Sequence, residues 1–374
     1  MKIIHLSDLH IGKRVLGYSM LENQKYILDR IVEIIEDEKP DVVAIAGDVY
    51  DKTNPSEEAV NLLDDFLVRL SKLDAEVFVL SGNHDSPEKI AFASRLIDAS
   101  GIHMSPVYNG MLSSYKLTDE YGDVNIYMLP FIKPLHVRRY YPEAIISNYT
   151  DAVKVALDKM NIDSSKRNIL IAHQFVTGSK TCDSEISVGG VENVDADCFL
   201  PFDYVALGHI HTPQDVVKNK IRYCGTPLKY SFSEEKQNKS VTVIEIKEKG
   251  DVKVTLRELK PLYDFVVVTG TFEDIMEKYK NRIINDYVQI VLKDENDVPD
   301  AFRRLQNIFV NLMHMSYDNK RTNERKRLEN LPIEKELSEL EMVSELYKLQ
   351  LNRALTKEQE KYIEKIIDKV KEDC

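Results

Sequence analysis

Five polar motifs occur along this chain, and each follows directly after a short apolar run. The apolar runs are residues 2–6, 42–46, 77–80, 169–172 and 204–207. Their length and β-branched content are typical of buried strands. The motifs behind them are, in order, Asp8-Leu9-His10, Gly47-Asp48, Gly82-Asn83-His84-Asp85, His173 and Gly208-His209-Ile210-His211. Because ligands of open α/β sheets gather just beyond the carboxyl ends of strands, the five motifs are expected to meet in one cleft.

The side chains of these motifs form a metal-ligand set of imidazoles, carboxylates and one amide. Such a set suits Mn²⁺, Fe²⁺ or Zn²⁺ better than Ca²⁺, and the absence of cysteine from the motifs disfavours a structural zinc site. Too many ligands are present for one tetrahedral ion, and they suit two ions that share a carboxylate. Two metals about 3.5–4 Å apart can hold a bridging hydroxide and clamp both oxygens of an in-line displacement at phosphorus. The candidate ligands are Asp8, His10, Asp48, Asn83, His173, His209 and His211.

His84 is the one imidazole of the series that is not needed as a ligand. As the neighbour of Asn83 it can reach the cleft, and Asp85 is expected to orient its ring. A free imidazole at this place can donate a proton to a leaving alkoxide. His84 is therefore the candidate general acid.

Each motif alone has an ordinary explanation, such as a polar turn around Gly82 or a hydrogen-bonded polar residue at His173. His209 and His211 by themselves could be two buried rings on one strand. The order of the motifs, each behind a strand, favours the catalytic interpretation of the whole series. The other four histidines, His5, His103, His136 and His314, are assigned to structural or surface roles.

Bulk properties limit the class of protein. At 374 residues the chain is longer than one core usually supports, which predicts two or three domains. A charged residue occurs too early in the N-terminal segment for a signal peptide, and no apolar stretch approaches the length of a membrane span, about 20 residues. The four cysteines show no C-x-x-C pairing, so we expect a reduced chain in the cytoplasm.

The formal net charge of −12 argues against binding of nucleic acid by bulk electrostatics alone. It excludes neither local basic surfaces nor a partner that supplies most of the binding.

The pattern of the sequence changes after residue 235. Residues 1–235 alternate strand-like and helix-like segments and carry all the motifs. Residues 236–315 predict a small α+β accessory domain, with strands near 241–246, 252–256, 265–268 and 287–292 and helices near 272–280 and 301–309. Residues 316–331 are polar and predict a linker.

Residues 332–374 show two amphipathic helical patterns and predict a helical hairpin. So short a hairpin buries little on itself, so it either docks on its own chain or binds a partner. The polar linker before it favours the partner.

These motifs resemble those of the calcineurin-like metallophosphoesterases, which share D-x-H, GD, GNH[DE], H and G-H-x-H on a double-sheet α/β sandwich of α/β/β/α layers. The closer resemblance is to the double-strand-break repair nucleases of the meiotic recombination eleven or SbcD type. It rests on HLSDLHIGK (5–13), LSGNHDSP (80–87), ALGHIHTPQ (206–214), CGTP (224–227) and SFSE (231–234). It is strong over residues 1–235, while the accessory domain and hairpin match in layout more than in motif.

The resemblance implies a Mn²⁺-dependent DNA nuclease, with exonuclease activity on double-strand ends and endonuclease activity. Two Mn²⁺ ions per chain are implied, with His84 as the catalytic histidine. One ion would be held by Asp8, His10, Asp48 and His211, and the other by Asp48, Asn83, His173 and His209.

The resemblance also implies partners. A homodimer would form through helices at residues 54–70 and 87–98, and the accessory domain would cap the site and help to select DNA. The terminal hairpin would bind the coiled-coil base of an SMC-like ABC ATPase of the SbcC type. That partner would carry much of the electrostatic work of DNA binding for an acidic chain.

One position departs from part of the family. Many relatives have a histidine where this chain has Asp51, so the balance between exonuclease and endonuclease activity stays open. Two other functions are alternatives. A small-substrate phosphodiesterase or phosphatase on the same metal centre has little use for a tethered hairpin. A non-enzymatic, metal-stabilised scaffold would be expected to have lost ligands, yet every ligand position is filled.

Overall fold

The computed structural model describes residues 1–183, 192–320, 322, 340, 343–344, 347 and 355–372. The chain divides into two compact units, Met1–Ser316 and Tyr317–Cys374. The first unit contains two six-stranded sheets and a separate three-stranded sheet.

The first six-stranded sheet has the order β14-β13-β1-β4-β5-β6. Its strands β1, β4, β5 and β6 are mutually parallel, while β13 runs antiparallel to β1 and β14 antiparallel to β13. The strand bounds are β1 Lys2–Leu6, β4 Val42–Ile45, β5 Glu76–Val79, β6 Ile102–Met104, β13 Ser240–Ile246 and β14 Val252–Glu258.

The second six-stranded sheet has the order β11-β12-β10-β9-β8-β7. Strands β8, β9, β10 and β12 are parallel, and the edge strands β7 and β11 run antiparallel to their neighbours. The bounds are β7 Ser113–Asp119, β8 Gly122–Leu129, β9 Arg167–His173, β10 Tyr204–Gly208, β11 Gln214–Val217 and β12 Ile221–Tyr223.

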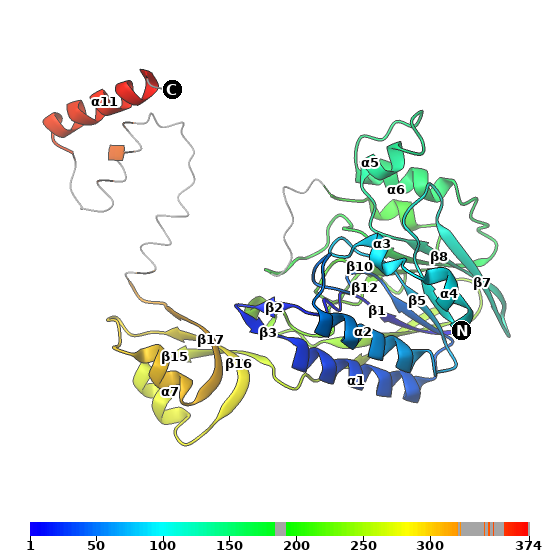
Figure 1. Cartoon of the computed structure of the whole chain (residues 1–374), viewed down its shortest axis with the longest axis horizontal. Coiled ribbons are helices and arrows are strands. Elements are labelled where there is room, and N and C mark those ends of the chain that lie inside the picture. The colour runs from blue at the N-terminus through cyan, green and yellow to red at the C-terminus, as the bar shows by residue number, and fades with distance from the viewer. Residues whose placement is uncertain are drawn as a thin grey trace. The chain divides into compact units, whose positions relative to one another are not determined.

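Three apolar clusters join these sheets and their helices into four layers. Alternate residues of β1 show the arrangement, because Ile4 packs toward the helices and Ile3 packs between the two sheets. Helices α1 (Leu21–Glu38) and α2 (Glu57–Leu70) cover the first sheet. Helices α5 (Pro134–Arg138) and α6 (Tyr149–Asp158) cover the second sheet on the opposite side (Figure 1). The predicted α/β/β/α sandwich is confirmed.

Strands β13 and β14 correct the predicted domain boundary. Both strands were predicted to lie in the accessory domain from residue 236, and that placement is wrong. The pairing of Ile3 with Ile244 puts β13 beside β1 in the first sheet. An apolar run predicts a strand without saying which sheet it joins, so the pattern alone could not place these two.

The remaining part of the first unit is a three-stranded sheet of order β15-β16-β17, with β15 and β16 parallel. Its elements are β15 Phe265–Gly270, α7 Phe272–Lys278, β16 Ile284–Leu292, α8 Ala301–Gln306 and β17 Phe309–Tyr317. This accessory domain combines three strands with two helices, begins after β14 ends at Glu258, and has a last strand that was not predicted.

A second correction concerns the helix expected at residues 87–98. The structure has two short helices there, α3 (Pro87–Ile90) and α4 (Ser94–Ile97), followed by η1 (Asp98–Ser100). They are interrupted at Ala93, whose backbone is left-handed with φ of 59°. The smaller elements β2 (Arg14–Val15), β3 (Tyr18–Ser19), η2 (Ala196–Phe199) and η3 (Phe232–Glu234) complete the first unit.

In the second unit the structure describes α11 (Lys357–Glu372), which coincides with the second predicted helix of the hairpin. Most of the first predicted helix and most of the polar linker lie outside the described residues. Among the residues that are described, no helix has both the length and the apolar character needed to cross a membrane.

Candidate metal centre

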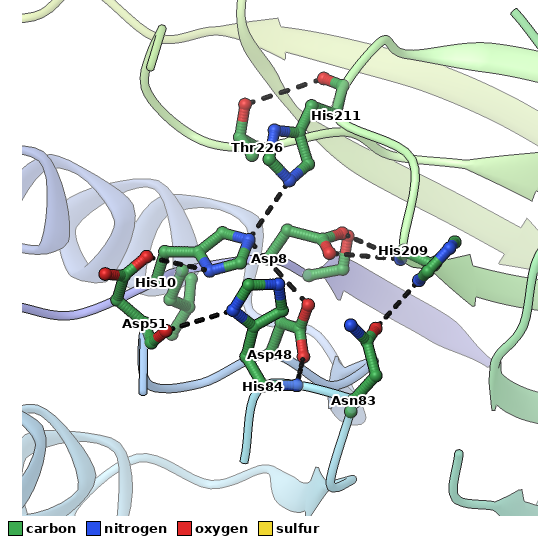
Figure 2. Close-up of polar contacts among 12 residues, drawn as sticks. Asp8, His10, Asp48, Asp51, Asn83, His84, His209, His211 and Thr226 are labelled. Carbon is green, nitrogen blue, oxygen red and sulfur yellow. Dashed lines mark hydrogen bonds and ion pairs between the residues drawn. The ribbon is translucent and has the colours of Figure 1, made fainter. Parts of the chain in front are cut away.

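The five motifs meet at one edge of the two sheets. Asp8 follows β1, Asp48 follows β4 and Asn83 follows β5, all in the first sheet. His173 ends β9 and His209 follows β10 in the second sheet. Figure 2 shows the labelled side chains from both sheets pointing toward one another. The sandwich thus assembles one cluster from strand ends that are distant in the chain.

One group of ligand atoms surrounds the amide oxygen of Asn83. Asn83 Oδ1 lies 3.0 Å from His173 Nε2 and 2.8 Å from His209 Nδ1. His173 Nε2 is also 3.4 Å from Asp48 Oδ2. Because His173 Nδ1 donates a hydrogen bond to the Ala46 carbonyl at 2.8 Å, Nε2 is the nitrogen that can present a lone pair to a cation.

A second group contains Asp8, His10 and His211, with one ligand atom of each within 4.8 Å of the other two. His10 Nε2 and His211 Nε2 are 3.0 Å apart. Lone pairs on both nitrogens would repel each other at this distance, so a shared proton or a bound cation is needed to offset the repulsion. His10 Nε2 is also 3.8 Å from Asp48 Oδ2. Asp48 Oδ2 therefore faces both groups, while its Oδ1 accepts a hydrogen bond from the backbone N–H of His84.

The charges of the site fit divalent cations. Burial raises the pKa of Asp8 to about 8, because the opposing effect of His173 is smaller. Burial would also raise the pKa of Asp48, but His173 and His10 hold that pKa well below its ordinary value. Burial lowers the pKa of His173, yet Asp48 and Asp8 outweigh it and raise the pKa to about 9. A positive charge is thus favoured at the His173 nitrogen that faces Asp48, and a metal ion bound there would supply it.

Four of the candidate ligand residues have a left-handed backbone, which non-glycine residues rarely adopt. The φ angles are 53° at Asp8, 45° at His10, 50° at Asp48 and 101° at His209. Such backbone costs on the order of 1–3 kcal/mol per residue and persists where the surroundings impose it. Its concentration at the strand ends supports a functional role for these loops.

The motif glycines are required by close packing around the ligands. A Cβ at Gly82 would lie 2.1 Å from Asp48 Oδ1, and a Cβ at Gly208 would lie 1.9 Å from the Ala46 carbonyl oxygen. Real Cβ atoms essentially never approach other atoms within 3.0 Å. This role of the glycines was not predicted from the sequence.

His84 lies at the mouth of the cluster, with its ring 4.9 Å from that of His10. Its Nδ1 donates a hydrogen bond to the backbone carbonyl of Asp51 at 3.0 Å. The expectation that Asp85 orients His84 is wrong. The buried Asp85 carboxylate accepts hydrogen bonds from the backbone N–H groups of Val49, Tyr50 and Gly82, which ties the second motif to the third.

Lys239 supports His211 from behind, a role that was not predicted. This buried ammonium donates hydrogen bonds to the His211 carbonyl at 3.0 Å, to Thr226 Oγ1 at 2.8 Å and to Glu234 Oε2 at 2.5 Å. Glu234 belongs to the SFSE motif, to which the sequence alone gave no role beyond a resemblance. A lysine directly before β13 gives no signal by itself, because only the fold brings it to His211.

A thiol also lies near this centre, although none of the five ligand motifs contains a cysteine. One ligand atom each of Cys182, His211 and Glu234 lies within 4.8 Å of the other two.

Comparison with known proteins shows the family. Residues 1–213 match the calcineurin-like phosphoesterase family, which is more than half of the chain. The chain belongs to this family. Residues 261–350 match a second family, the type 5 capsule protein repressor C-terminal domain, also named SbcD_C. This match begins close to the start of the accessory domain. The family assignment makes this SbcD-type chain a metal-dependent phosphodiesterase.

Two curated relatives cover most of the chain. One, the SbcD subunit of the nuclease SbcCD from Staphylococcus epidermidis, is 36% identical over 84% of this chain and 85% of its own length. The protein of the same name from Staphylococcus saprophyticus is 34% identical over 100% of this chain and 99% of its own length. A solved dimetal phosphatase from Danio rerio is 12% identical, with a TM-score of 0.43 over 70% of this chain and 98% of its own.

Proposed function

We propose that the chain is a Mn²⁺-dependent DNA nuclease that processes double-strand breaks in the prokaryotic cytoplasm, as an exonuclease on double-strand ends and as an endonuclease. The observation that carries this proposal is the position of Asp48 Oδ2, 3.4 Å from His173 Nε2 and 3.8 Å from His10 Nε2. A carboxylate between two ligand groups is suited to two cations that act on one phosphodiester. The nitrogen and oxygen donors of both groups suit Mn²⁺.

Two ions would be held by these residues, with Asp48 contributing to both sets. Asp8, His10 and His211 would complete one set, and Asn83, His173 and His209 would complete the other. When bound, two such ions would polarise the phosphoryl oxygens and activate water for in-line attack.

His84 supplies the proton for the leaving oxygen. The Asp51 carbonyl accepts its Nδ1–H at 3.0 Å, which orients the ring and leaves Nε2 as the nitrogen that delivers the proton. The Asp51 carboxylate pairs with Lys13 at 2.8 Å, so this residue contributes charge and a backbone acceptor instead of a proton.

A cavity beside the centre favours a polymeric substrate over a small one. It has a volume of about 640 Å³ and is lined by Lys13, Arg14 and Tyr230 on the nuclease side and by His314 and Gln289 on the accessory domain. The ring of Tyr230 is 5.9 Å from the ring of His10, which places the cavity next to the metal ligands. Two cationic side chains here can contact phosphates that flank the scissile one, and a small phosphoester has no such phosphates.

The remaining partners belong to the same proposal. Homologues named as the SbcD component of an SbcCD nuclease support an SbcC-type ATPase partner, which we propose binds residues 332–374. A homodimer through α2 and the α3–α4 segment is supported by Phe92 and Leu96, each 81% exposed. The accessory domain would then help to select DNA through the cavity that it lines.

The test is cleavage of end-labelled linear duplex DNA by the purified chain with Mn²⁺, with Mg²⁺ and with chelator. We expect Mn²⁺-dependent cleavage that His84→Ala lacks while the variant still binds the metal. Cleavage unchanged in His84→Ala would remove this residue from the mechanism, and hydrolysis of a small aryl phosphodiester without any cleavage of DNA would favour the small-substrate alternative.

Arg14→Met tests the cavity separately. We expect weaker DNA cleavage and unchanged hydrolysis of the aryl phosphodiester, because Arg14 is not among the metal ligands. Lys116→Met is the matched control, since Lys116 is an exposed lysine on β7 of the second sheet. Equal DNA cleavage by Arg14→Met and the native chain would exclude the cavity from the DNA path.

A further inference from the structure

Cys182, His211 and Glu234 form a cluster beside the catalytic centre that the proposed mechanism does not explain. They come from three separate segments: the loop after β9, the loop after β10 and the end of η3. One ligand atom of each lies within 4.8 Å of the other two. His211 and Glu234 are buried, whereas Cys182 is partly exposed, so an ion from solvent can reach the cluster on the thiol side.

The donor chemistry of this cluster differs from that of the catalytic centre. The seven catalytic candidates offer only nitrogen and oxygen, while Cys182 adds sulfur. A thiolate, an imidazole and a carboxylate form a ligand set typical of Zn²⁺, with the remaining position left to water. Zinc-ligand bonds of about 2.0–2.3 Å would require atoms separated by as much as 4.8 Å to close up by roughly 1 Å.

We propose that Cys182, His211 and Glu234 bind a thiophilic divalent cation such as Zn²⁺, and that this site competes with the catalytic centre for His211. Binding releases the thiol proton of Cys182 to solvent and forms a metal–sulfur bond. His211 Nε2 lies only 3.0 Å from His10 Nε2, so movement of this ring toward Cys182 takes a ligand from the first catalytic group. Binding does not depend on the proposed nuclease activity, but inhibition by the bound ion does.

Lys239 weakens Glu234 as a metal ligand. Its ammonium lies 2.5 Å from Glu234 Oε2, and the other carboxylate oxygen accepts a hydrogen bond from the Tyr230 N–H at 3.2 Å. Glu234 is therefore the weakest of the three ligands, and the thiolate supplies most of the selectivity. Two other described cysteines are poor competitors, because burial raises the pKa of Cys198 to about 11 and that of Cys224 to about 12.

The test is a Co²⁺ titration of the reduced, metal-stripped full chain, read by ultraviolet and visible absorption. A sulfur-to-cobalt charge-transfer band in the near ultraviolet reports a thiolate ligand, whereas ligand-field bands report cobalt at nitrogen and oxygen sites as well. We expect the charge-transfer band in the native chain and in the control Cys374→Ser, and its loss in Cys182→Ser. The ligand-field bands that persist in Cys182→Ser show that the catalytic centre is folded.

Absence of the charge-transfer band from the native chain, or its survival in Cys182→Ser, would overturn the site. Competition is read separately as Zn²⁺ inhibition of Mn²⁺-dependent hydrolysis of an aryl phosphodiester. We expect Cys182→Ser to need at least ~10-fold more Zn²⁺ for half inhibition. Equal inhibition of both chains would refute competition for His211. A native chain that shows the band but no Mn²⁺-dependent hydrolysis would count against the proposed function alone.

Discussion

Gly82→Ala is expected to disrupt the metal centre by displacing Asp48. The added Cβ would lie 2.1 Å from Asp48 Oδ1 and 2.4 Å from its backbone nitrogen. Separation to 3.0 Å requires a movement of about 1 Å, and overpacking of this kind costs about 1–3 kcal/mol. Because Asp48 Oδ2 faces both ligand groups, the same movement should weaken the binding of both ions. A misplacement of ~1 Å can lower activity by ~100-fold.

Gly270→Ala is the matched control for this change. Gly270 also lacks a positive φ, and its added Cβ would meet Ile275 Cγ1 at 3.4 Å, which is ordinary contact. Mn²⁺ affinity is measured by calorimetry, and the free energy of unfolding by urea denaturation of the metal-free chains. We expect a large loss of affinity for Gly82→Ala and native affinity for Gly270→Ala. Native Mn²⁺ affinity in Gly82→Ala would refute the argument that glycine is needed to seat Asp48.

Three further predictions test other parts of the structure. Lys239→Met leaves the buried carboxylate of Glu234 without its ammonium partner, so the free energy of unfolding, measured with urea, should fall by about 3–5 kcal/mol. A fall of less than about 1 kcal/mol would contradict the role of this pair. Burial, reinforced by the charge of Arg222, lowers the pKa of His5 to about 3. The stability that neutral His5 contributes is therefore complete above pH 6.5 and is lost as the pH falls toward 3. Between pH 7 and pH 5 the metal-free native chain should therefore lose about 2 kcal/mol more than His5→Gln, and parallel pH profiles would refute this. Truncation after Asn330 should keep Mn²⁺-dependent activity and abolish association with the ATPase in a pull-down, whereas retained association would exclude the hairpin as the binding element.

The convergence of the candidate ligands was predictable because its signal is local. Each ligand follows a strand within a few residues, and the carboxyl ends of parallel strands share one edge of a sheet. Asp8, Asp48 and His173 could therefore be assigned to one cleft before any fold was known. The roles of the motif glycines were not predictable, because they depend on contacts between loops of different strands.

The missed features are those that depend on long-range pairing. The apolar pattern of β13 predicted a strand, and its nearly continuous burial is typical of a strand covered on both faces, but only the pairing with β1 shows its sheet. Strand β17 was missed because Asn311 and His314 interrupt its apolar pattern. Ala93 adopts a left-handed backbone in a segment whose apolar spacing predicts one helix, so tertiary context overrides local propensity there.

Cys182 illustrates the same limit at the functional site. It lies nine residues beyond His173, outside every motif, and gives no signal of metal binding in the sequence. The fold places its thiol beside His211 and Glu234. Contacts between loops that are distant in the chain can be identified only from the folded structure.

The proposed mechanism requires that Asp48 be shared by two metal ions. The most direct measurement is the Mn²⁺ content of the native chain and of Asp48→Asn after equilibrium dialysis, determined by mass spectrometry of the metal. We expect two Mn²⁺ per native chain and weakened binding of both ions in Asp48→Asn. A single Mn²⁺ in the native chain, or two fully retained ions in Asp48→Asn, would contradict this mechanism.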